Sequence, residues 1–179
     1  MNHEELKSQL MGAAMQPFIK SLFDRLHVDR GGTLYNSFEE VSSRRPLAGG
    51  QNRTSRADVV TFISTGAYDD KPKFYNRANF SVVFEVKATA SDLDRDEKYV
   101  NYLSCTDFFF FAVPTGVCAH ALYKASEMPN VGVFDIQRGI IVKMPEPQTI
   151  VPSYYMELLE QVTYCQRRNS GKRNTAVDA

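Results

Sequence analysis

The chain has 179 residues, enough for one domain with a substantial core, and 43% of them are hydrophobic. Its 21 basic and 21 acidic residues cancel, which excludes a general polyanion-binding surface and requires any nucleic-acid contact to be a local patch. The longest apolar run, Phe108–Val113, is too short to cross a bilayer, and no secretory signal is recognisable at the N-terminus. The three cysteines show no CxxC spacing and the three histidines form no HExxH pattern, which argues against a zinc site. The few cysteines favour a protein with reduced thiols in the cytoplasm.

Hydrophobic spacing predicts the elements of the first half of the chain. Apolar residues recur at helical spacing over residues 4–26, with Asn2 as the N-cap and Pro17 as a point where the helix kinks or divides. Residues 33–41 predict a strand and 44–55 a loop, and a second strand is expected over 57–64. A polar connection over 66–79 leads to a third strand, 80–86, whose continuous hydrophobicity predicts burial on both faces.

The second half predicts a helical crossover and a further group of strands. Ser91 is expected to cap a helix over 91–103, followed by a strand over 107–113 and a short helix over 117–126. Residues 131–136 and 139–144 predict two strands joined by a turn at Gln137 and Arg138, and 154–167 a final helix. Polar residues 169–179 are expected to be a disordered tail after a single domain over 1–168. This order predicts an α/β fold, a mixed central β-sheet flanked by helices.

Two carboxylates and a lysine stand at the ends of predicted strands. Asp58 lies near the start of the second strand, and Glu85, Val86 and Lys87 end the third. In an antiparallel pair these two ends meet at the same edge of the sheet. Because side chains alternate along a strand, Glu85 and Lys87 project to one face, whereas Val86 leaves its backbone carbonyl available.

Such a group of residues suits the hydrolysis of a phosphodiester. Mg²⁺ or Mn²⁺ prefers carboxylate, carbonyl and water oxygens, so Asp58, Glu85 and the Val86 carbonyl are candidate metal ligands. Lys87 is the candidate for orienting or deprotonating the attacking water and for stabilising negative charge. Solvated charges at strand ends are the alternative, but their position at the end of a buried apolar run favours the metal site.

Other residues could complete this site. Glu40 could add a third carboxylate and is preferred over Glu39, because alternation lets only one of the two face the site; two solvated edge charges are the alternative. Lys98 and Tyr102 would share a helix face and could contact phosphate, although a tyrosine packed on the sheet beside a surface lysine is equally open. Arg56 belongs to a group of loop arginines that either face nucleic acid or are solvated.

These motifs form an ordered string over roughly residues 33–144. Its members are Arg56-Ala57-Asp58-Val59, Phe84-Glu85-Val86-Lys87, Ser91-Asp92-Leu93, Asp96, Lys98, Tyr102-Leu103, Cys105-Thr106-Asp107, Phe110-Phe111-Ala112-Val113 and Val131-Gly132-Val133. The string resembles the PD-(D/E)XK nuclease superfamily and, within it, most closely the MmcB-like group of DNA-repair proteins.

The resemblance implies a restriction-endonuclease-like core in which Asp58 and Glu85 bind the metal ion and Lys87 is catalytic. It further implies a Mg²⁺- or Mn²⁺-dependent enzyme that hydrolyses DNA in repair, recombination or defence. DNA is then the expected partner, a homodimer or a protein partner is also open, and no membrane is involved. The alternative is a catalytically inactive module of the same fold that binds nucleic acid or a protein, because fold does not fix function.

Overall fold

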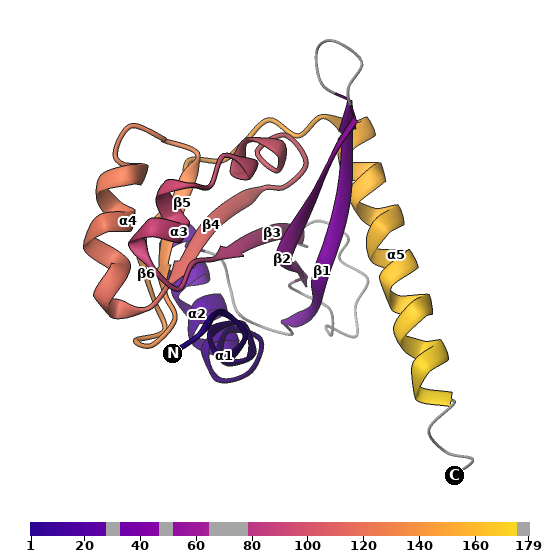
Figure 1. Ribbon diagram of the computed structural model, residues 1–179, viewed down its shortest axis with the longest axis horizontal. Helices are drawn as coiled ribbons and strands as arrows, with labels where there is room; N and C mark the ends of the chain where they lie inside the picture. The colour runs from indigo at the N-terminus through magenta and orange to yellow at the C-terminus, as the bar shows by residue number, and fades with distance from the viewer. Residues whose placement is uncertain (28–32, 47–51, 65–78, 175–179) are drawn as a thin grey trace.

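A six-stranded mixed sheet flanked by helices forms the centre of the protein (Figure 1). The computed structural model describes residues 1–27, 33–46, 52–64 and 79–174. The strands lie in chain order across the sheet: β1 (Leu34–Pro46), β2 (Asn52–Ser64), β3 (Asn79–Val86), β4 (Phe108–Val113), β5 (Val131–Asp135) and β6 (Ile140–Lys143). Pairing is antiparallel from β1 to β3, parallel from β3 to β5, and antiparallel between β5 and β6. The predicted α/β class is therefore confirmed.

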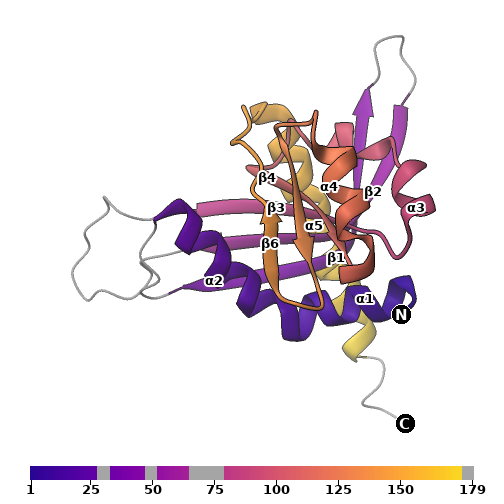
Figure 2. The same cartoon turned by 90° about the vertical axis from the view of Figure 1, so that its left-hand side faces the viewer.

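The N-terminal helices cover one face of this sheet (Figure 2). They are α1 (His3–Gln9), a π-helical turn (Leu10–Ala14) and α2 (Met15–Leu26). Asn2 caps α1 as predicted, because its side chain accepts a hydrogen bond from the Glu5 amide while the Glu5 carboxylate accepts one from the Asn2 amide. The expected division of the helix falls in the π-helical turn just before Pro17, whose missing N–H cannot continue the regular ladder.

Strand alternation divides the hydrophobic core between the two faces of the sheet. Under α2, the Phe18 ring makes edge contacts with Phe84, Phe110 and Phe134 at centroid distances of 4.8, 5.1 and 5.0 Å. The opposite face, which includes Phe109, is covered by α4 (Cys118–Ala125), which follows a 3₁₀ turn (Thr115–Val117), and by α5 (Pro152–Asn174), which packs against β1. Both faces of the central strands are therefore buried, as their sequences predict.

The first hairpin is longer than the sequence predicts. β1 continues to Pro46 and β2 begins at Asn52, so most of the expected loop over 44–55 is paired strand, with Arg44 opposite Thr54. Polar residues can occupy these strand positions because the β-ladder provides hydrogen-bond partners for their backbone N–H and C=O groups. Pro46, which has no N–H to donate, is tolerated because it ends an edge strand. Residues 47–51, and the connection expected over 66–79 except for its last residue, lie outside the described part of the chain.

The crossover helix is also different from its prediction. In place of one helix over 91–103 there is α3 (Ala90–Asp94), capped by the Thr89 side chain and not by Ser91, and then a 3₁₀ helix, η2 (Lys98–Asn101). The short non-helical link between them directs Asp96 towards β3. At the other end of the chain, α5 extends through the first residues of the expected tail to Asn174, and residues 175–179 are outside the described ranges. No helix in the described ranges is long and apolar enough to cross a membrane.

Candidate functional site

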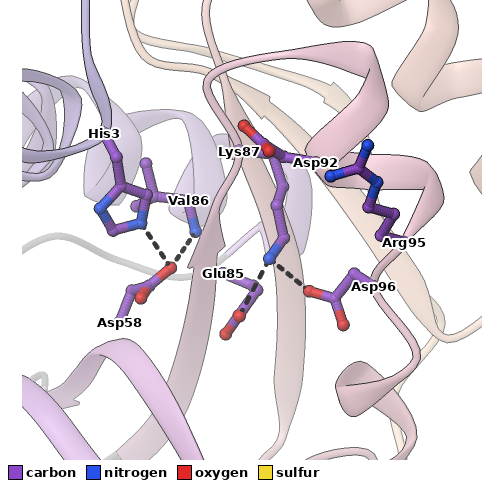
Figure 3. A pocket seen from close by; sticks show the side chains of 8 residues that line it. All are labelled: His3, Asp58, Glu85, Val86, Lys87, Asp92, Arg95 and Asp96. Carbon is purple, nitrogen blue, oxygen red and sulfur yellow. Dashed lines mark hydrogen bonds and ion pairs between the residues drawn. The ribbon is translucent and has the colours of Figure 1, made fainter.

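Asp58 lies at the point where the pairing between β2 and β3 ends. The last ladder pair joins Val59 to Phe84, and one further step in this register places Asp58 level with Glu85. The Asp58 carboxylate accepts a hydrogen bond of 2.8 Å from the Val86 amide, so a side chain takes the position of the next backbone acceptor (Figure 3). Its side chain is 14% exposed. The fold therefore brings together the first carboxylate and the Glu85-Val86-Lys87 segment, as the sequence predicts.

Glu85 is a buried carboxylate whose ionisation the protein only partly compensates. One of its oxygens, Oε1, lies 3.1 Å from Nζ of Lys87, whereas Oε2 is buried without a hydrogen-bond partner among the described residues. Burial, followed by the negative charge of Asp58, raises the pKa of Glu85 to about 8, with a further contribution from Asp96 against the opposing effect of Lys87. An additional cation beside these carboxylates would relieve their mutual repulsion.

Lys87 joins two carboxylates from different elements. Its Nζ lies 3.1 Å from Glu85 Oε1 and 2.5 Å from Asp96 Oδ2, and its side chain is 12% exposed (Figure 3). Burial disfavours the charged ammonium, but these two carboxylates outweigh that effect and raise the pKa of Lys87 above its usual value. In this arrangement Lys87 is a cation at neutral pH and not a proton acceptor.

His3 is a member of the site that the sequence did not indicate. Its Nε2 lies 3.2 Å from Oδ2 of Asp58, so the first turn of α1 reaches the middle of β2, where the pairing of β2 with β3 ends. A contact between residues so far apart in the chain leaves no local pattern. A pocket of about 300 Å³ is lined by His3, Asp58, Glu85, Val86, Lys87, Asp92, Arg95 and Asp96 (Figure 3).

The side chains that line this pocket suit a metal ion that keeps several water ligands better than one that is coordinated entirely by the protein. In the described parts of the chain, no group of three or more His, Cys, Asp or Glu side chains is placed to hold a metal ion together. Asp58 and Glu85 nevertheless line one pocket, and Glu85 contributes a buried oxygen without a hydrogen-bond partner among the described residues. Mg²⁺ keeps several waters and commonly binds through one or two carboxylates plus a substrate phosphate. Asp58 and Glu85 can supply these carboxylates.

Glu40 lies beside this pocket but contacts other residues. Its Oε1 is 2.8 Å from Nζ of Lys7, and its second oxygen forms an ion pair with Arg56. The backbone of Glu40 has a φ of 56°, a left-handed conformation at an irregular point of β1. Glu39 is exposed, so alternation separates the two neighbours as expected. The structure thus places Glu40 with Lys7 and Arg56, and not among the residues that line the pocket.

The three candidates for nucleic-acid contact have different positions. Arg56 is at the surface, with 65% of its side chain exposed. Tyr102 is fully buried and stacks on Phe109 with a centroid distance of 6.2 Å, which places its ring in the core and not on a nucleic-acid surface. Burial and then the charges of Glu85 and Asp58 raise the pKa of Tyr102. Lys98 lies in η2, and its side chain is outside the described part of the protein.

Comparisons with known proteins bear on the fold alone. The chain matches no protein-family model and no curated protein. Among solved structures it is similar to SPO1766, a protein of unknown function from Silicibacter pomeroyi, with 22% sequence identity and a TM-score of 0.50. The similarity covers 92% of this chain and 94% of that one. It therefore extends over nearly all of both chains and assigns no activity.

Proposed function

We propose that this chain is a metal-dependent nuclease with a restriction-endonuclease-like core, which hydrolyses DNA phosphodiester bonds with Mg²⁺ or Mn²⁺. The observation that carries the proposal is the meeting of Asp58 and Glu85 from adjacent strands in one pocket that also contains the Lys87 ammonium. Carboxylates that repel one another next to a fixed cation suit a site that takes a second, divalent cation.

Each of the three residues has a distinct role in this proposal. Asp58 and Glu85 would hold the metal ion, which when bound activates water and neutralises charge on the phosphate. The backbone carbonyl of Val86 is a further candidate ligand. Lys87 stabilises the negative charge that develops on the phosphoryl oxygens, because its own carboxylate partners keep it protonated. Asp92 and Asp96 leave the metal-free pocket negatively charged overall, so a phosphate would enter favourably only with the cation.

DNA contact in this proposal depends on local positive charge. Because the chain is neutral overall, surface residues near the site must supply the attraction, and the exposed Arg56 on β2 would do so by exchanging its ion pair with Glu40 for a phosphate. A homodimer or a protein partner would supply further contacts. The activity would serve DNA repair, recombination or defence in the cytoplasm.

A module of the same fold that binds nucleic acid or a protein without cleavage is the second candidate. The observation that favours it is that, over the described ranges, the acidic side chains form no group of three placed around one metal position. In addition, the Lys87 ammonium already lies between Glu85 and Asp96. Metal-independent binding of DNA without product formation would identify this function.

The deciding experiment incubates the purified full chain with single-stranded DNA, double-stranded DNA and RNA, each with Mg²⁺, Mn²⁺ or EDTA. We expect metal-dependent cleavage of DNA that falls at least about 100-fold in Lys87→Met, Asp58→Asn and Glu85→Gln. Asp94→Asn is the matched control, because it removes an acidic charge close in sequence that pairs with His120 outside the pocket. Absence of cleavage under all conditions, or equal cleavage by the three variants, would overturn the proposal.

A further inference from the structure

The Lys87 ammonium lies closer to Asp96 than to Glu85. The Nζ to Oδ2 distance to Asp96 is 2.5 Å, against 3.1 Å to Oε1 of Glu85. The Asp96 side chain is 1% exposed, and it comes from the link between α3 and η2 and not from the sheet. A carboxylate this deeply buried is normally paired, and its partner here is the lysine assigned to catalysis.

The segment that carries Asp96 is fixed from outside by α4. Nζ of Lys124 donates hydrogen bonds to the backbone carbonyls of Leu93 and Asp96, the latter at 3.1 Å. Within the same segment, the Asp94 carboxylate lies 2.7 Å from Nε2 of His120, also on α4. Asp96 is therefore held by contacts that do not depend on Lys87, which makes it an anchor for that side chain.

We infer that Asp96 is a positioning residue that draws Lys87 away from Glu85 and so leaves Glu85 available to the metal ion. This inference rests on the proposed function, since it assigns metal binding to Glu85. Without the Asp96 charge, the remaining ion-pair partner of Lys87 in the described structure is Glu85. The ammonium would then move onto that carboxylate and compete with the divalent cation for it. Asp96 accordingly increases metal affinity through Lys87, without being a ligand.

The test measures Mn²⁺ binding to the full chain by electron paramagnetic resonance, with no nucleic acid present. The variants are Asp96→Asn, Lys87→Gln, the double variant, and Asp94→Asn as a control of equal charge. We expect Asp96→Asn to weaken Mn²⁺ binding about tenfold and Asp94→Asn to change it less than about threefold, because Asp94 pairs outside the pocket.

The decisive result is the coupling between the two substitutions. If Lys87 competes for Glu85, Lys87→Gln increases Mn²⁺ affinity by a larger factor in the Asp96→Asn background than in the wild type, by about threefold or more. Equal factors in both backgrounds would mean that the charges act independently on the ion, and would overturn the positioning role. A chain that binds no Mn²⁺ at all would overturn this inference and the proposed function together.

A second double-mutant cycle, with the same two substitutions, tests the contact between Asp96 and Lys87 in the absence of metal. Urea unfolding of the same variants in EDTA should reveal a coupling between Asp96 and Lys87 of about tenfold in the unfolding equilibrium constant, as expected for a buried ion pair. Absence of coupling would overturn the inference even if Asp96→Asn weakened metal binding. Coupling in both cycles in a protein that cleaves no nucleic acid would leave the positioning role standing and overturn only the nuclease proposal.

Discussion

Asp58 and Val86 are joined by a hydrogen bond of 2.8 Å between a carboxylate oxygen and a backbone amide. This contact continues the pairing of β2 with β3 by one step, with a side chain as the acceptor. The candidate metal ligand therefore also has a structural role, because the buried Val86 amide depends on it. Substitutions of Asp58 must be chosen so that the two roles are separated.

Asp58→Ala and Asp58→Asn should differ in stability but not in activity. Alanine leaves the Val86 amide without an acceptor and should lower the free energy of unfolding by about 1–3 kcal/mol. Asparagine retains an acceptor oxygen and removes the repulsion with Glu85, so it should be at least as stable as the wild type in metal-free buffer. Urea denaturation in EDTA measures both. Equal destabilisation by the two substitutions would contradict the structural role.

The contribution of Glu85 to stability in the absence of metal should fall as the pH rises. The pKa of Glu85 increases from 4.5 to about 8 on folding, chiefly because of burial, so the folded state binds more protons than the unfolded state between these values. The stabilising effect of the protonated carboxyl group is complete below pH 4.5 and is lost as the pH rises through about 8.

The Glu85→Gln variant provides the measurement for this pH dependence. Urea denaturation in EDTA at pH 5 and at pH 8 should show that the stability of the variant relative to the wild type increases with pH. Mg²⁺ should stabilise the wild type more at pH 8 than at pH 5, because metal binding requires the ionised carboxylate. Parallel pH profiles of the two proteins would show that Glu85 is not the titrating group.

Glu40→Gln should affect stability more than metal affinity. The substitution weakens the contact with the nearly buried Lys7 ammonium and should lower the free energy of unfolding by about 1–3 kcal/mol. Because Glu40 does not line the pocket, Mn²⁺ affinity should change by less than about threefold. If Glu40→Gln reduced Mn²⁺ affinity as much as Asp58→Asn does, Glu40 would be a ligand and its contact with Lys7 would have to open.

Gly132→Ala should destabilise the centre of the sheet. A Cβ atom at this position would lie 2.5 Å from the Phe110 ring and 2.8 Å from Cδ of Pro145, so both neighbours must shift. We expect a loss of about 1–3 kcal/mol in thermal or urea unfolding. Gly12→Ala is the control, because a Cβ there meets no described atom within 4 Å, and it should be neutral or slightly stabilising. A neutral Gly132→Ala would contradict the packing of β5 on β4.

The arrangement of Asp58 with Glu85 and Lys87 was predictable because local periodicity predicts the two strands and an antiparallel pairing brings their ends together. The apolar run that ends in Glu85 predicts a buried strand, and alternation alone places Lys87 on the same face. Asn2 was recognisable as a cap because it directly precedes the helical pattern, with the acidic Glu4 and Glu5 in the first turn, and the structure adds the capping box with Glu5.

Other members of the site depend on contacts that local patterns do not reveal. The helical spacing after Ser91 suggested one continuous helix, but the chain leaves the helix where Asp96 pairs with Lys87. For Tyr102 the sequence left two positions open, contact with phosphate and packing on the sheet, and the structure shows the second, with its ring stacked on Phe109 in the core. His3 contacts Asp58 only because the fold brings the first turn of α1 to the point of β2 where its pairing with β3 ends. In each case tertiary packing, and not the local sequence pattern, decides where the side chain lies.

The most direct test of the account is an anomalous difference map from a crystal of the full chain soaked in Mn²⁺. The account predicts a peak about 2 Å from carboxylate oxygens of both Asp58 and Glu85, with Lys87 held by Asp96. Density next to the Val86 carbonyl would identify the third protein ligand. A saturated crystal with no peak in this pocket, or with Mn²⁺ bound elsewhere, would contradict the central claim.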